Sequence, residues 1–162
     1  MTRAPVVGVL LLMISSAYAA QGPAPDFGTI TTACRDLVLD YAFYRDRPDA
    51  DAVADLFTHD AEFVIQGQTF RGREEIRTRI VRGQGGPVFR HLMSTIRIFP
   101  ENAQHARGVS YATVYSAPPG TQPLSLQSPA AVGEYHDEFE LTQDGWKIRR
   151  REFFAVFVPD AN

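Results

Sequence analysis

Two runs of alternating apolar and polar residues near the end of the chain are separated by the dipeptide Asp144-Gly145. An Asp-Gly step between alternating runs is a strong short-range signal for a β-hairpin. Because side chains alternate along a strand, one face of the first run carries two polar groups beside two apolar ones: Tyr135, Asp137, Phe139 and Leu141. A phenol and a carboxylate on an otherwise buried face indicate a lined cavity rather than a dry core.

The spacing of apolar residues changes from helical in the first half of the chain to alternating in the second half. Alternation predicts four long strands, at residues 89–99, 106–115, 132–141 and 146–157. Upstream, helical spacing predicts an amphipathic helix over residues 29–45, and Pro48 favours a second helix over residues 49–57. We also expect a short strand over residues 62–66 and a third helix from Gly72. Helices followed by long antiparallel strands predict an α+β domain.

The first residues are typical of an export signal. Arg3 gives a positive start, residues 6–14 are apolar but too few to span a membrane as a helix, and residues 17–19 form a small-x-small cleavage site. We therefore expect residues 1–19 to be a cleaved signal peptide, residues 20–28 a linker and residues 29–158 the folded domain. The expected location is periplasmic or secreted, with no membrane attachment after cleavage.

Composition and charge limit the possible functions. A chain of 162 residues that is 44% hydrophobic and 22% charged is ordinary for one globular domain. Its net charge of −3 gives no general basic field for nucleic acid. The single cysteine, Cys34, has no partner for an internal disulfide, and its helical spacing with apolar residues predicts a core position. We find no spacing of ligands typical of a metal site.

An ordered set of motifs resembles the SnoaL-like branch of the NTF2-like superfamily. The motifs are residues 56–63, residues 70–76, His91, residues 133–137 and the Gly145-Trp146 step, and the resemblance covers about residues 30–157. It implies a cone-shaped fold in which a curved antiparallel sheet packs on N-terminal helices around an internal pocket. It does not imply one activity, because function resides in the site and not in the fold.

The resemblance implies a catalytic pair formed by Asp46 and His91. Dehydratases of the superfamily, such as scytalone dehydratase, use an aspartate after the first helix and a histidine at the start of a long strand, and these two residues match those positions. Tyr41 fits the place of a tyrosine in the bile-acid dehydratases, whereas Arg45 replaces a tyrosine of scytalone dehydratase. The second catalytic histidine of that enzyme has no convincing match here. Alternatively, Asp46 braces the helix end and His91 bonds to backbone.

Tyr135 and Asp137 form a second candidate pair, because both are expected to face the pocket. In SnoaL-like cyclases the catalytic acid/base is an aspartate on a late strand, which Asp137 matches. From the residues alone, Asp137 is as compatible with an ion pair to Arg149 or Arg151 across the hairpin. Arg151 also matches the arginine that the family carries after the Gly-Trp turn, where it supports the pocket or neutralises Asp137.

These observations favour a cofactor-free acid/base enzyme, of dehydratase or isomerase type, that acts on a small apolar compound with a carbonyl or hydroxyl group. A carboxylate can hold an imidazole in one tautomer while the imidazole moves a proton. The alternative is a pocket protein that binds a small molecule without catalysis. We further expect a homodimer through the outer sheet face, on which we place Ala112, Val114 and Val132, and we expect neither a metal, a cofactor nor a nucleic-acid partner.

Overall fold

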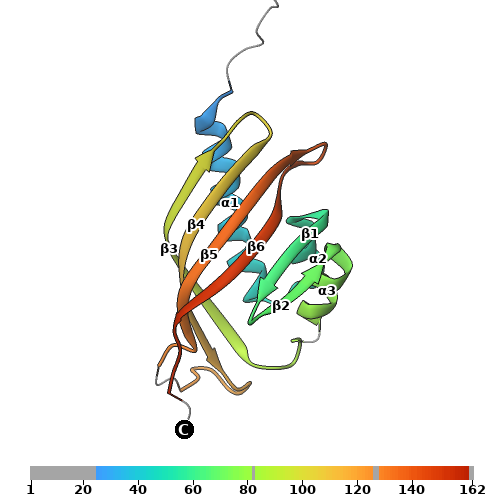
Figure 1. The fold of residues 1–162 in the computed structure, drawn as a ribbon. Coiled ribbons are helices and arrows are strands. Elements are labelled where there is room, and N and C mark those ends of the chain that lie inside the picture. Colours follow the sequence, from blue (N-terminus) through green and yellow to red (C-terminus); the bar gives the residue numbers. More distant parts are fainter. Residues whose placement is uncertain (1–24, 82, 126–127, 161–162) are drawn as a thin grey trace, which may run out of the picture.

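The computed structural model describes residues 25–81, 83–125 and 128–160. The expected signal peptide and most of the expected linker lie outside these residues. One long helix crosses one face of a large tilted sheet, and two short helices lie beside the small strands at one side (Figure 1). Helices packed on one face of a curved, open sheet confirm the predicted α+β fold. None of the described helices is long and apolar enough to cross a membrane.

The three helices found in the described residues follow the predicted order but not all of the predicted bounds. Helix α1 (Phe27–Arg45) begins two residues early because the side chain of Asp26 caps it, accepting from the backbone N–H of Gly28 at 3.0 Å. Helix α2 (Ala50–Asp55) is capped by Asp49 and is shorter than expected, since the chain enters a strand at Phe57. Helix α3 (Gly72–Val81) buries Ile76 and Ile80, as predicted.

Six strands form one sheet in the order β2-β1-β6-β5-β4-β3. Strands β3 (Val88–Pro100), β4 (His105–Ala117), β5 (Ala131–Thr142) and β6 (Gly145–Phe157) are antiparallel neighbours, which confirms the four predicted strands. Strand β1 (Phe57–Ile65) starts earlier than predicted, and β2 (Gln68–Arg71) was not predicted. The pairing of β1 with β6 is parallel, so the sheet is mixed and not wholly antiparallel.

The predicted hairpin joins β5 and β6. Thr142 pairs with Gly145, and Gly145 takes a φ of 94°, a left-handed value that glycine adopts at little cost. The Thr142 hydroxyl donates to the carbonyl of Gly145 at 2.9 Å and so closes the turn. Bulges shift the register of β5 against β6 after Glu138 and of β3 against β4 after Ser94, and such bulges bend a sheet.

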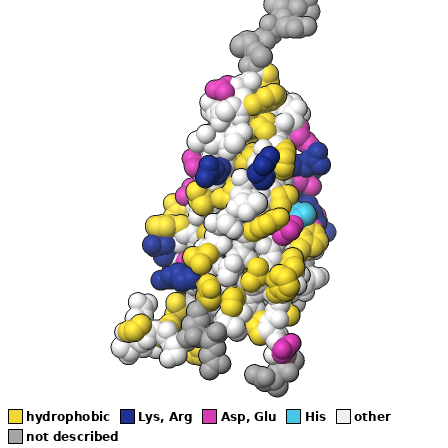
Figure 2. Space-filling view, turned by 90° about the vertical axis from the view of Figure 1, so that its left-hand side faces the viewer, with side chains coloured by type: hydrophobic (Ala, Val, Ile, Leu, Met, Phe, Trp, Pro, Cys, Tyr) yellow, Lys and Arg dark blue, Asp and Glu magenta, His cyan; other side chains and the backbone are white. Residues whose placement is uncertain are grey.

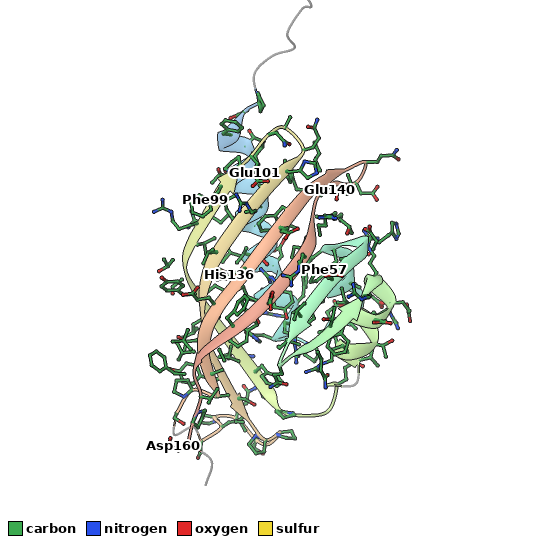
Figure 3. All side chains as sticks on the ribbon, in the orientation of Figure 1. Phe57, Phe99, Glu101, His136, Glu140 and Asp160 are labelled. Carbon is green, nitrogen blue, oxygen red and sulfur yellow. The ribbon has the colours of Figure 1, made fainter. Side chains whose placement is uncertain are left out.

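The inner face of β4 corrects one prediction. Ala112 is 1% exposed, and Val114 is 8% exposed and lines a cavity, so neither belongs to the outer face. Residues paired across antiparallel strands share a face, and Ala112 pairs with Gly133 whereas Val132 pairs with Thr113. The predicted outer-face set therefore combines two inner-face residues, Ala112 and Val114, with Val132, which lies on the opposite face. On the opposite, exposed face, His136 lies over the middle of β5 (Figure 3).

Candidate active site

A cavity of about 510 Å³ opens between α1, α3 and the inner face of the sheet. Its walls come from most elements of the domain and are largely aromatic or aliphatic, with Phe63, Phe89 and Phe153 among them. Three of the predicted site residues also line it: Tyr41, His91 and Tyr135. An apolar cavity with a few convergent polar groups is the usual form of a small-molecule site.

Asp46 and His91 are held together at the edge of this cavity. Asp46 follows the last residue of α1, where its backbone N–H still bonds to the carbonyl of Ala42, and His91 lies near the start of β3. Oδ1 of Asp46 is 2.6 Å from Nδ1 of His91, and Oδ2 accepts from the His91 backbone N–H at 3.0 Å. Because both carboxylate oxygens engage one residue, the imidazole has little freedom to turn.

This geometry leaves one nitrogen of His91 available. Asp46 does not itself line the cavity, whereas His91 does. With Nδ1 engaged by the carboxylate, Nε2 has no hydrogen-bond partner in residues 25–81, 83–125 and 128–160. The predicted proximity of Asp46 and His91 is therefore present, and the free nitrogen belongs to a residue of the cavity wall. A histidine held in one tautomer and orientation by a carboxylate is well suited to proton transfer.

Tyr41 and Tyr135 add two phenols to the same wall. The ring of Tyr41 meets His91 edge-on at 6.4 Å and Tyr135 at 5.6 Å between ring centroids. Burial raises the pKa of Tyr135 well above its ordinary value, and Tyr41 raises it further, whereas the nearby charge of Arg151 opposes this. The Tyr135 hydroxyl therefore remains protonated at neutral pH and can donate a hydrogen bond.

Asp137 and Arg151 do not face the cavity, which corrects the prediction that both are pocket residues. They form a bidentate ion pair, in which Arg151 Nε lies 2.7 Å from Asp137 Oδ1 and Arg151 Nη2 lies 2.8 Å from Asp137 Oδ2. Both side chains are fully buried. The reason is register, since Asp137 lies directly opposite Arg151 across the β5–β6 pair. Of the two partners considered from sequence, Arg149 instead contacts Glu138.

The buried arginine supports the cavity from behind. Its guanidinium carbon lies 4.3 Å from the ring centre of Tyr41 and 4.6 Å from that of Tyr135. Burial acts to lower the pKa of Arg151, but the charge and hydrogen bonds of Asp137, with smaller contributions from Tyr41 and Tyr135, together outweigh it and the pKa is raised. The arginine therefore stays charged and holds both phenol rings by cation–π contact.

Two cavity residues were missed by sequence reasoning. Arg45 enters the sequence analysis only as a departure from scytalone dehydratase, and no motif singles out Arg79, yet both line the cavity. Arg45 could have been found, because it lies four residues after Tyr41 on the buried face of α1. Within the described part of the chain, no group of three or more His, Cys, Asp or Glu is placed to hold a metal ion.

Several solved structures share this fold. One is a protein of unknown function from Mycobacterium tuberculosis, with a TM-score of 0.71, 22% identity and coverage of 81% of this chain and 79% of that one. A proposed scytalone dehydratase from Novosphingobium aromaticivorans has a TM-score of 0.69, 20% identity and coverage of 83% and 89%. A hexachlorocyclohexane dehydrochlorinase from Novosphingobium barchaimii has a TM-score of 0.68, 20% identity and coverage of 81% and 89%.

Sequence comparison gives the family. No curated protein matches the chain. The family model described as SnoaL-like domain matches residues 29–152, which is most of the described domain. The chain therefore belongs to the SnoaL-like domain family and has the NTF2-like fold.

Proposed function

We propose that this protein is a cofactor-free acid/base lyase or isomerase, and that Asp46 and His91 are its catalytic pair. The substrate is a small, mostly apolar compound that carries a carbonyl or hydroxyl group. The observation that carries the proposal is the 2.6 Å contact between Asp46 Oδ1 and His91 Nδ1, with the histidine on the wall of an apolar cavity. The contact leaves Nε2 for the substrate.

The proposed chemistry is an elimination of water from a β-hydroxy carbonyl compound. Nε2 of His91 takes a proton from the carbon next to the carbonyl, and the electron pair of that bond forms the new double bond. The bond from carbon to the hydroxyl oxygen breaks, and the imidazolium returns its proton to that oxygen, so water leaves. Asp46 stabilises the imidazolium between these steps, while the Tyr135 hydroxyl donates to the carbonyl oxygen.

Isomerisation uses the same groups. If the proton returns to a different carbon of the substrate, the double bond moves and no water leaves. The names of two structural neighbours, a proposed dehydratase and a dehydrochlorinase, both denote eliminations, which favours the first outcome for this chain.

The second candidate is a protein that binds a small molecule and does not transform it. One observation favours it: Oδ2 of Asp46 accepts from the backbone N–H of His91, a contact that braces the end of α1 against β3 whether or not chemistry occurs. This reading predicts ligand binding without turnover, and it predicts that changes to His91 alter affinity alone.

Proton exchange tests the proposal without knowledge of the natural substrate. The protein is incubated in D₂O with 4-hydroxy-4-phenyl-2-butanone, and NMR follows deuterium entry beside the carbonyl and formation of the conjugated enone. We expect both to require His91 and to be lost in His91→Ala. Tyr111→Phe, on the exposed face, is the matched control and should retain full rates. Equal exchange in wild type and His91→Ala would reject the acid/base role.

Export is part of the proposal. Residues 1–19 have the charge, apolar stretch and cleavage triplet of a signal peptide. We expect N-terminal sequencing of protein recovered from outside the cytoplasm to begin at Ala20. An intact Met1 on secreted protein would contradict this.

We also propose a homodimer through the outer sheet face. That face exposes large apolar side chains despite the correction to Ala112 and Val114: Leu92, Phe99, Tyr111 and Phe154. Apolar groups also follow the side of the molecule where β3 forms the sheet edge (Figure 2). Pairing by a two-fold axis would cover them. Light scattering that gives a monomer mass at high micromolar concentration would reject the dimer.

A further inference from the structure

Two arginines of the cavity wall have no acidic partner among the described residues. Arg45, at the end of α1, is only 8% exposed, and its guanidinium carbon lies 4.6 Å from the ring centre of Phe89. Arg79 lies in the last turn of α3, and its guanidinium carbon is 5.9 Å from the ring centre of Phe70. Neither forms an ion pair within residues 25–81, 83–125 and 128–160. Both line the cavity that contains His91.

The acids near this cavity are already engaged. Glu152 is the one carboxylate among the described lining residues, and its Oε2 lies 2.7 Å from Nη2 of Arg150. Asp46 lies behind the wall with both oxygens on His91. The cavity thus holds two cations whose charge no described side chain neutralises. A nearly buried cation without a partner is costly, so an anion that enters the cavity gains a strong interaction.

We propose that the ligand of this cavity is a small organic acid whose carboxylate is bound by Arg45 and Arg79. A planar guanidinium offers parallel N–H donors that match the two oxygens of a carboxylate. The apolar body of the acid then lies against the aromatic wall formed with Phe89, and its other end reaches Tyr135 and His91. Only the reaction at that far end rests on the proposed function; the binding of the acid does not.

Carboxylate is favoured over phosphate by the donors present. Two arginines in a largely apolar wall suit one negative charge shared between two oxygens. Phosphate sites usually add a run of backbone N–H groups at a glycine-rich turn before a helix. Comparing the affinities for 2-naphthoate and 2-naphthyl phosphate decides between the two anions.

Calorimetric titration with ligands of one shape tests this proposal. The probes are 2-naphthoate, the neutral 2-naphthamide and 2-naphthyl phosphate. Because hydrogen bonds to charged groups are the strong ones, wild-type protein should bind naphthoate about 10- to 100-fold more tightly than the amide. Arg79→Gln and Arg45→Gln should each remove most of this preference and leave amide affinity little changed. Arg77→Gln is the matched control, because Arg77 lies on the same helix but contacts Asp51.

Each other result counts against the proposal. The amide binding as tightly as naphthoate, no binding of either at millimolar concentration, or a preference that survives both glutamine variants would overturn it. If 2-naphthyl phosphate binds more than tenfold more tightly than 2-naphthoate, the assignment of a carboxylate is overturned. If Arg45→Gln does not fold, Arg45→Lys replaces it, because lysine keeps the charge but lacks the parallel N–H donors of arginine, and it should still weaken naphthoate binding. Unchanged naphthoate affinity in both Arg45→Lys and Arg79→Gln would also overturn the proposal.

The outcome can be separated from that of the proposed catalytic role. Asp46 does not line the cavity, so Asp46→Asn should keep the preference for naphthoate. In the wild-type protein, a preference for naphthoate without any proton exchange would reject the catalytic role alone. Proton exchange that depends on His91 but shows no preference for acids would reject the anion site alone.

Discussion

Among the described residues, two largely buried aspartate pairs have nearly equal contact lengths and very different surroundings. The Asp46–His91 pair has a contact of 2.6 Å and one partner on the cavity wall. The Asp137–Arg151 pair has contacts of 2.7 and 2.8 Å, and neither side chain is exposed. Contact length therefore does not distinguish the proposed catalytic pair from the structural one. What distinguishes them is that Nε2 of His91 has no hydrogen-bond partner in the described part of the chain and belongs to a residue of the cavity wall.

The same contrast separates what each pair contributes. Arg151 keeps its proton, because its surroundings, with Asp137 foremost among them, raise its pKa by more than burial lowers it. It stabilises the rings of Tyr41 and Tyr135 instead. His91 contacts Asp46 and the ring of Tyr41, and it is the one histidine among the described residues of the cavity wall. We therefore expect changes at Asp46 and His91 to affect activity, and changes at Asp137 and Arg151 to affect stability.

The largest expected effect is on turnover at the cavity pair. Asp46→Asn and His91→Ala should each lower turnover by about 100- to 10,000-fold, because proton transfer by a positioned group contributes on that scale. The double variant should be little worse than either single variant, since the two residues act as one unit. Ligand affinity and the free energy of unfolding should change little. Multiplicative losses in the double variant would show that the two residues act independently.

The next largest effect is on stability at the buried pair. Arg151→Met leaves the carboxylate of Asp137 buried without a partner, so the free energy of unfolding should fall by about 3–5 kcal/mol. Urea unfolding measures this. The matched control is Arg149→Met, whose exposed contact with Glu138 should contribute about 0–1 kcal/mol. Replacing both members, Asp137→Leu with Arg151→Met, should recover much of the loss, and a double variant as unstable as Arg151→Met would contradict the explanation.

The smallest expected effect is on the reactivity of Cys34, whose buried thiol is influenced by the charge of Asp137. Burial and, to a smaller extent, the charge of Asp137 together raise the pKa of its thiol to about 12, so the reactive thiolate is scarce at pH 8. Iodoacetamide should therefore label native wild-type protein very slowly. In Arg151→Met, labelling should be on the order of 100-fold faster, because the lost stability populates opened states. Equal rates, measured by mass spectrometry, would place Cys34 outside the region that the pair stabilises.

Much of the fold could be predicted because the long strands alternate without interruption. Strands β3 to β6 and the turn at Gly145 were found from that pattern. Strand β1 was only half found, because Thr58, His59 and Asp60 interrupt the alternation of apolar residues. Its parallel neighbour, β6, is far away in sequence, and no local pattern reports such a pairing.

The site was partly predictable for a related reason. The positions of Asp46 and His91 came from the family resemblance, whereas the partner of Asp137 depends on a bulge. Counting back from the Thr142–Gly145 pair without interruption would place Asp137 opposite Arg150. The shift of register after Glu138 places it opposite Arg151 instead and turns both side chains into the core. Arg45 and Arg79 were missed because a cavity built from many segments leaves no pattern in any one of them.

The parallel contact between β1 and β6 has a consequence for the order of folding. Phe63 pairs with Arg151, and these residues are about 90 positions apart in the chain. During synthesis β1 is complete long before its neighbour exists, and closing so long a loop is slow. A chain halted before β6 leaves one edge of β1 and one edge of β5 without hydrogen-bond partners. That intermediate is the form in which this protein is most exposed to association with other chains.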